Sequence, residues 1–131
     1  METFTIGQLA KRTNVNLETI RFYERKGLLP EPPRNESGHR QYSIKDLRRT
    51  AFIKRTQSIG FSLQEIFDLL SFKVGTGKTC GDVKKRVKAK LIDIEEKIKT
   101  LQRMREVLLR LEADCPGKGS LNDCPILETV D

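Results

Sequence analysis

The sequence has few of the residues that build a large hydrophobic core. Its 131 residues contain no tryptophan, and aromatic residues make up only 6% of the chain. Apolar residues make up 37% and charged residues 33%, so a large single core is not expected and part of the burial should come from a second chain. The length suits one ordinary domain, or a small domain with a long helical extension. These numbers argue against a large enzyme.

The sequence also lacks any long hydrophobic run. No apolar stretch approaches the roughly 20 residues that a membrane-spanning helix needs, and the N-terminal Met1-Glu-Thr-Phe4 carries an acidic residue where a secretory signal carries basic ones. We therefore expect a cytoplasmic protein that makes no membrane contact. Thiols stay reduced there, so the three cysteines should be free core residues, metal ligands or redox groups rather than disulfides.

Acidic residues are outnumbered, and unevenly so along the chain. The sequence has 25 Lys and Arg against 18 Asp and Glu, a formal net charge of +7. Residues 1–60 contain 12 basic and 6 acidic residues, whereas residues 61–131 contain 13 and 12. A positive excess of this kind favours polyanions such as nucleic acid, and it belongs to the first half of the chain.

Two short helices are predicted at the N-terminus. Thr5-Ile-Gly-Gln8 fits a capping box, which predicts a first helix to about Thr13. Asn16 is a favourable N-cap for a second helix, which Gly27 ends. The sequence thus predicts a helix-turn-helix unit at about residues 5–27.

A hairpin and two more helices should follow. Residues 30–43 contain three prolines, which exclude a helix, and Asn35 to Gly38 supply turn chemistry between two short extended runs. We interpret this segment as a small wing. Ser43-x-x-Asp46 and Ser62-x-x-Glu65 are capping boxes that predict two further helices within residues 44–72. Residues 1–72 are therefore expected to form a winged helix-turn-helix DNA-binding domain.

A long helix is predicted in the second half, after a linker at residues 73–79. Residues 80–112 contain no proline and, after Gly81, no glycine. Apolar residues recur there at spacings of 4, 3, 4, 3, 3, 4 and 3, a heptad seam with one stutter. A helix of roughly 45 Å cannot bury this seam against so small a chain, so we predict an antiparallel coiled-coil dimer. The seam consists of Val87, Leu91, Ile94, Ile98, Leu101, Met104, Leu108 and Leu111.

The fold class predicted from these segments is mainly α. The C-terminal residues 113–131 contain Pro116, Gly117, Gly119 and Pro125 and are expected to be loop with at most one short turn of helix.

A helix-turn-helix followed by a basic hairpin suits recognition of double-stranded DNA. One helix enters the major groove while flanking cations contact phosphates. We expect the second helix to be the reader. An ordinary solvated basic surface is the alternative interpretation. The candidate contact residues are Thr19, Arg21, Tyr23 and Arg25 of the second helix, Arg34, His39, Arg40 and Tyr42 of the wing, and Lys45, Arg48 and Arg49 of the third helix.

The three cysteines lie at the two ends of the predicted long helix. Cys80 begins this helix, whereas Cys115 and Cys124 follow its end. Within one chain Cys80 and Cys115 would lie on the order of 50 Å apart, too far to share a ligand. Antiparallel pairing would place Cys80 of one subunit beside Cys115 and Cys124 of the other, giving two equivalent sites by symmetry. The simpler alternative to a metal site is that the three cysteines are small buried apolar residues.

Ligand number and softness limit the choice of metal. Structural zinc commonly uses four ligands in paired CxxC spacing, and this sequence has no CxxC, while its single histidine belongs to the wing. Three thiolates favour a soft ion that accepts low coordination, with Hg(II) first and Pb(II) or As(III) behind it. Asp114 and Asp123 could complete a Cd(II) or Zn(II) site. Binding across a dimer would couple the metal to subunit geometry.

Three stretches closely resemble the MerR family of bacterial transcription regulators. They are Thr19-Ile-Arg-Phe-Tyr-Glu-Arg-Lys-Gly-Leu-Leu29, Arg40-Gln-Tyr42 and Ile59-Gly-Phe-Ser-Leu-Gln-Glu-Ile66, and the resemblance covers essentially the whole chain. It implies a homodimer that binds a palindrome in promoter DNA and acts on bacterial RNA polymerase. The inducer makes such a regulator bend and untwist the DNA, which turns repression into activation.

The resemblance also implies roles for single residues. Arg21 and Tyr23 of the reader helix, and Arg40 and Tyr42 of the wing, should contact DNA. The cysteines, 35 and then 9 residues apart, resemble those of mercury-responsive members of the family. Lead-responsive members have a similar spacing, so Pb(II) remains the principal alternative to Hg(II) as inducer.

Two other functions are weighed against this one. A cysteine-dependent redox or detoxifying enzyme is disfavoured, because the sequence contains neither CxxC nor a Cys and His pair, and Gly75-Thr-Gly-Lys-Thr79 lacks P-loop spacing. A regulator with the same DNA-binding half could instead hold an organic inducer in its coiled-coil half.

Overall fold

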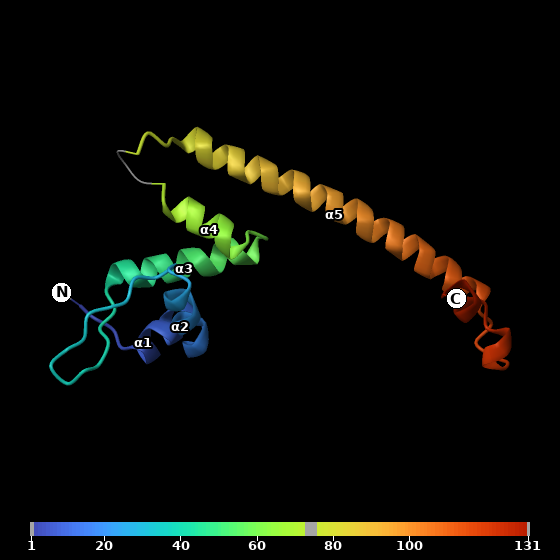
Figure 1. Ribbon diagram of the computed structural model, residues 1–131, viewed down its shortest axis with the longest axis horizontal. Coiled ribbons are helices and arrows are strands. Elements are labelled where there is room, and N and C mark those ends of the chain that lie inside the picture. The colour runs from blue at the N-terminus through green and yellow to red at the C-terminus, as the bar shows by residue number, and fades with distance from the viewer. Residues whose placement is uncertain (1, 73–75, 131) are drawn as a thin grey trace. The chain divides into compact units, whose positions relative to one another are not determined.

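The computed structural model describes residues 2–72 and 76–130, with side chains described to residue 127. This part of the chain is mainly α, as predicted, and contains two isolated β-bridges but no longer strand (Figure 1). The helices, in chain order, are α1 (Ile6–Thr13), α2 (Leu17–Arg25), α3 (Ile44–Ser58), α4 (Leu63–Leu70), α5 (Cys80–Asp114), the 3-10 helix η1 (Leu121–Asp123) and α6 (Pro125–Val130).

Short polar caps define the helix-turn-helix. The Thr5 hydroxyl accepts a hydrogen bond from the Gln8 N–H at 3.1 Å, and the Gln8 side chain accepts one from the Thr5 N–H at 2.9 Å. Asn14 ends α1 in the left-handed region at φ 55°, and Asn16 then caps α2 by accepting from the Glu18 N–H at 2.7 Å. The predicted capping box and N-cap are confirmed, and they set the tight turn between the two helices.

The predicted wing is a short hairpin. Arg34 and Arg40 form an antiparallel bridge, and the Gln41 N–H donates to the Pro33 carbonyl at 2.8 Å. Gly38 turns the chain at φ 83°, a conformation that L side chains rarely adopt. The base of the wing is held by paired backbone hydrogen bonds of 2.8 and 2.9 Å between Phe4 and Tyr42. The wing is thus attached to the segment that leads into α1.

A small core supports α1 to α4. Helix α1 packs against α2 and α3, and α3 packs against α4. The capping boxes at Ser43 and Ser62 start α3 and α4 as predicted. The fully buried apolar or aromatic side chains come from all four helices, from the turn after α2 and from the wing: Leu9, Ile20, Leu28, Leu29, Tyr42, Ile53 and Ile66. Among the residues that the structure describes, the last member of this core in chain order is Leu70.

Helix α5 is continuous over 35 residues and ends two residues after the predicted boundary. Its start is fixed by Asp82, whose carboxylate accepts from the Thr79 N–H at 2.7 Å and from the Thr79 hydroxyl at 3.2 Å. The hydrogen bond from the Thr79 backbone lowers the pKa of Asp82. Most of the predicted seam is exposed in the single chain, namely Val87, Leu91, Ile98, Leu101, Met104 and Leu108.

The C-terminal segment is more helical than predicted. We expected loop with at most one short turn, but the structure contains both η1 and α6. Ser120 caps η1 by accepting from the Asn122 N–H at 3.2 Å. Pro125 occupies the first position of α6, where its fixed φ and missing N–H favour a helix.

Contacts divide the chain into two compact units, Met1–Lys85 and Arg86–Asp131. The division lies inside α5, so the first residues of this helix belong to the N-terminal unit. Part of the predicted linker, residues 73–75, lies outside the described residues. Among the described helices, none is both long enough and apolar enough to cross a bilayer.

Candidate DNA interface and candidate metal ligands

Helix α2 has one buried face and one exposed cationic face. Ile20 and Tyr23 are buried against the core, whereas Arg21 and Arg25 point to solvent and Thr19 is half-buried. Arg21 pairs with Glu18 at 2.8 Å, but both side chains remain largely exposed, so water and salt screen this pair strongly. The exposed face of α2 therefore offers a guanidinium to an external anion.

Tyr23 supports α2 from its buried side. Its side chain is 2% exposed, and its hydroxyl donates to the Gln57 side chain of α3 at 2.6 Å. Burial raises the pKa of Tyr23 above its ordinary value. The phenol thus connects the expected reader helix to α3. This placement does not favour the direct DNA contact that the family resemblance implied for Tyr23.

A second buried network connects α2 to the wing. Glu24 of α2 accepts a hydrogen bond from the Tyr42 hydroxyl at 2.6 Å, and its other carboxylate oxygen pairs with the Arg40 guanidinium. The Glu24 side chain is only 8% exposed. Burial, followed by the hydrogen bond to Glu24, raises the pKa of Tyr42 to about 12. Tyr42 is therefore a structural link between wing and helix, and its burial does not favour direct contact with DNA.

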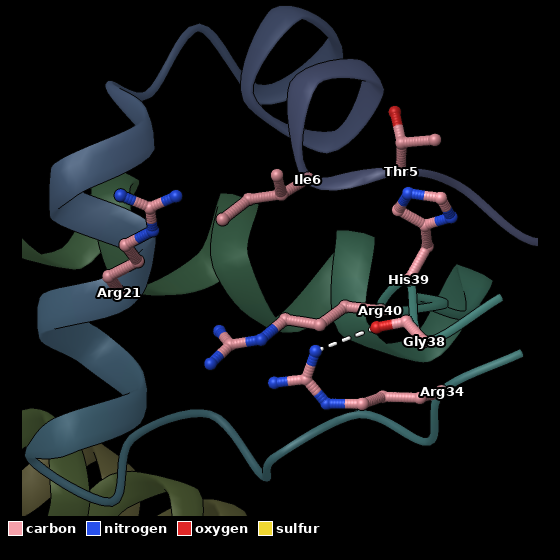
Figure 2. A pocket seen from close by; sticks show the side chains of 7 residues that line it. All are labelled: Thr5, Ile6, Arg21, Arg34, Gly38, His39 and Arg40. Carbon is pink, nitrogen blue, oxygen red and sulfur yellow. Dashed lines mark hydrogen bonds between the residues drawn. The ribbon is translucent and has the colours of Figure 1, made fainter.

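Arginines from α2 and the wing line one pocket of the N-terminal unit. The pocket is lined by Thr5 and Ile6 at the start of α1, Arg21 of α2, and Arg34, Gly38, His39 and Arg40 of the wing. Figure 2 shows the guanidinium groups of Arg34 and Arg40 reaching from the wing toward the side of the pocket where Arg21 lies. The Arg34 side chain is held by a 2.8 Å hydrogen bond to the Gly38 carbonyl.

Helix α3 adds cations of two kinds. Lys45 and Arg48 are exposed. Arg49 is half-buried and donates from Nε to the Leu28 carbonyl at 2.5 Å, so it stabilises the turn after α2. Lys54 likewise donates to the Asn14 carbonyl at 2.6 Å. Of the three α3 residues predicted to contact DNA, the exposed pair is therefore better placed than Arg49.

No sequence pattern indicates a partner for Glu24 or Gln57. The one available signal for Glu24 is its position four residues after Ile20, which places its carboxylate on the same face of the helix as a buried apolar residue. Gln57 gave none, because its partner Tyr23 is 34 residues away in the sequence. Long-range hydrogen bonds of this kind leave no periodic pattern.

The structure leaves the three cysteines free. Cys80, the first residue of α5, is exposed, while Cys115 and Cys124 are half-buried. A helix of 35 residues is about 52 Å long at 1.5 Å per residue, and Cys80 and Cys115 mark its two ends. Within the described part of one chain, no three His, Cys, Asp or Glu side chains come together as a metal site.

A helix-turn-helix with an attached wing and exposed arginines on both defines a winged-helix DNA-binding protein. Comparison with known proteins agrees. Residues 4–73 match the "MerR HTH family regulatory protein" model, and residues 47–111 match the "MerR, DNA binding" model. The chain belongs to the MerR family of transcription regulators.

Relatives are similar over nearly the whole chain. A mercuric resistance operon regulatory protein of Bacillus cereus is 44% identical over 127 residues, which is 97% of this chain and 96% of the relative. PbrR691 of Ralstonia metallidurans CH34, solved in complex with lead(II), has a TM-score of 0.84 at 34% identity, covering 96% of this chain and 98% of that one.

A MerR of Bacillus megaterium MB1 has been solved in complex with the mercury(II) ion. Its TM-score is 0.71 at 40% identity, with 97% of this chain and 98% of that chain covered. The relatives are transcription regulators, and the present chain is likewise a regulator rather than an enzyme.

Proposed function

We propose that this protein is a homodimeric, Hg(II)-responsive regulator of a mercury-resistance operon. It represses transcription without metal and activates it when Hg(II) binds, by bending and untwisting promoter DNA for RNA polymerase. The observation that carries this proposal is the position of the three free cysteines, one at the start of α5 and two beyond its end.

The exposed seam of α5 supports the dimer. Its large apolar side chains are about half exposed in the single chain, which is costly unless another surface covers them. Antiparallel pairing of two copies would cover this seam and bring the start of one helix to the end of the other. Each end of the dimer would then hold Cys80 of one subunit with Cys115 and Cys124 of the other.

The donor set favours a soft metal ion. Three thiolates match the preference of Hg(II) for sulfur and for low coordination numbers. The similarity to the B. cereus regulator named for mercuric resistance points the same way. The lead(II)-bound PbrR691, which has the higher TM-score of the two metal-bound neighbours, favours Pb(II) as the alternative inducer. Asp114 and Asp123 are exposed beside two of the thiols and would complete a Cd(II) or Zn(II) site.

The proposed DNA-binding surface combines α2, the wing and α3. Arg21, Arg34, Arg40 and Arg48 would contact the duplex, with Thr19 beside Arg21 on the reader helix. Tyr23 and Tyr42 would act through their hydrogen bonds to Gln57 and Glu24, which fix the angles of helix and wing. Double-stranded promoter DNA is thus the expected partner of the N-terminal unit.

A competitive metal titration tests the proposal. The reduced full-length protein is titrated with Hg(II), Pb(II), Cd(II) and Zn(II) in the presence of a small competing thiol, while thiolate-to-metal absorption is followed. We expect Hg(II) to bind most tightly, with one ion for each set of three cysteines. Tighter binding of Pb(II) than of Hg(II) would make Pb(II) the inducer. Absence of any metal binding that depends on the cysteines would overturn the metal-responsive function.

A further inference from the structure

We propose that the pocket between α1, α2 and the wing binds one phosphate group of the DNA backbone, and that His39 makes this contact depend on proton uptake. The inference rests on the proposed DNA-binding function and assigns a role to the single histidine of the sequence. It predicts that DNA binds more tightly as the pH falls.

The pocket concentrates positive charge from separate elements. Arg21 comes from α2, whereas Arg34, His39 and Arg40 come from the wing (Figure 2). The start of α1, at Thr5 and Ile6, adds the positive end of the helix dipole. Among the described residues, no carboxylate lines this pocket or the adjacent one that also contains His39. Arg21 also pairs with the exposed Glu18, and Arg40 pairs with Glu24, so two of the arginines are partly compensated. An added anion would still be attracted to the pocket, because Arg34 contributes a further guanidinium.

A phosphodiester suits this pocket better than a buried small anion would. Arg21, Arg34 and His39 are exposed, so a charge on a large polymer can reach them. The planar guanidinium group matches the geometry of phosphate oxygens. The pocket also adjoins the exposed face of α2, and a backbone phosphate beside the groove would therefore meet it when α2 reads the bases.

The wing fixes the position of His39 and leaves its ring available. The backbone N–H of His39 donates to the Asn35 side chain at 3.0 Å, and the backbone carbonyl of His39 accepts from the Asn35 N–H at 2.9 Å. In the described part of the chain no hydrogen bond or ion pair engages the imidazole. Figure 2 shows the ring beside Thr5, at the edge of the pocket. A phosphate there would accept a hydrogen bond from the imidazolium form.

Proton uptake follows from this contact. Histidine is the side chain that ordinarily changes charge between pH 5 and 8. A negative phosphate beside the ring stabilises the protonated form, so the complex binds the proton more tightly than the free protein does. The other charged residues that line the pocket are Arg21, Arg34 and Arg40. Glu18 pairs with Arg21 and Glu24 pairs with Arg40, and Glu24 and Glu31 line the neighbouring pocket that shares these two arginines. DNA affinity should therefore rise as the pH falls.

The test is a DNA titration at constant ionic strength between about pH 5.5 and 7.5, within the range where histidine ordinarily changes charge. The full-length, metal-free dimer is titrated with a duplex carrying its promoter and with a scrambled duplex. For the wild type we expect the affinity for both to fall several-fold as the pH rises across the range, because the contact made by the protonated ring is lost.

Variants at position 39 separate charge from shape. His39→Gln should bind with little dependence on pH, at the weaker affinity of the wild type near neutral pH. His39→Lys should bind at every pH of the range with the tighter affinity that the wild type has at the acidic end. Lys45→Gln is the matched control, because it removes one permanent cation from outside the pocket and should weaken binding by the same factor at every pH. Wild-type pH dependence in His39→Gln would overturn the inference.

A free-phosphate arm distinguishes DNA from a small anion. Inorganic phosphate is added to the protein without DNA at constant ionic strength, and the His39 ring signals are followed by NMR. We expect no saturable shift at submillimolar phosphate. Saturation there would assign the pocket to a free anion and overturn the DNA assignment. Loss of binding to both duplexes at every pH would instead refute the proposed function itself.

Discussion

Buried polar side chains decide how the parts of the N-terminal unit are held together at the scale of single residues. Glu24 is the clearest case, because its carboxylate is mostly buried and accepts from both Arg40 and Tyr42 of the wing. A buried donor that loses its acceptor keeps the full cost of leaving water. Glu24 thereby ties wing orientation to the helix that is expected to read DNA.

Replacing this carboxylate should destabilise the fold. We expect Glu24→Ala to lower the free energy of unfolding by about 2 kcal/mol, because it removes the acceptor of two wing side chains. Urea denaturation measures the loss. Glu18→Ala is the control, since Glu18 is 72% exposed and its pair with Arg21 should contribute at most about 0.5 kcal/mol. Equal losses in the two variants would show that the wing network adds no stability.

The two tyrosines give a second prediction at this scale. Both pKa values are raised, that of Tyr42 to about 12. A phenol with a raised folded-state pKa contributes stability that is fully present below its unfolded value near 10 and is lost as the pH rises through the folded value. The native protein should therefore show less tyrosinate absorbance at pH 10 than the unfolded protein and should lose stability as the pH rises further.

Absorbance is a clean measure here, because the sequence has two tyrosines and no tryptophan. The same titration in denaturant serves as the reference and should show both phenols ionising near their ordinary value. Two native-state ionisations near pH 10 would be incompatible with the buried hydrogen bonds of Tyr23 and Tyr42.

At the scale of secondary structure elements, the sequence predicted those features that are encoded locally. The capping boxes at Thr5, Ser43 and Ser62 mark three helix starts because a side chain and a backbone N–H three residues apart satisfy each other. Helix α6 differs from the predicted loop because a proline can either end a helix or occupy its first position, and Pro125 does the second. The Tyr23 and Tyr42 hydrogen bonds join distant residues, so only the fold could show them.

Helix α3 carries a prediction for DNA binding. Arg48 is exposed and is proposed to contact a phosphate. Arg48→Ala should weaken binding to all duplexes alike and reduce the slope of log affinity against log salt by about 1. Arg55→Ala, which removes an exposed arginine from the last turn of the same helix, is the control and should change neither quantity as much. A loss restricted to one duplex would indicate base contact instead.

At the scale of the whole molecule, the question is how cysteines at opposite ends of α5 could bind the same metal ion. The positions of the cysteines were predictable from sequence, since helix length follows directly from residue count. The proposed pairing of these cysteines involves a second chain. A metal site shared by two subunits should be rebuilt in a dimer of two different cysteine variants, whereas a site within one chain should not.

Mixed dimers test the shared site. A heterodimer of Cys80→Ser and Cys115→Ser chains should bind one Hg(II), because one end keeps Cys80 of one chain with Cys115 and Cys124 of the other. A heterodimer of Cys115→Ser and Cys124→Ser chains is the matched control and should bind none at a three-cysteine site, since each end lacks one thiol. Stoichiometry and thiolate-to-metal absorption measure both. Absence of Hg(II) binding by the first heterodimer would refute the cross-subunit arrangement.

The location of the core has a consequence for how such a regulator can evolve. The described core residues of the N-terminal unit all lie at or before Leu70, whereas residues 116–120, between Cys115 and Cys124, are exposed. Substitutions in this loop therefore disturb no described core packing and should cost little folding free energy. Ligand preference can then drift by changes in loop length or in the neighbours of the thiols, while the DNA-reading half stays under separate selection.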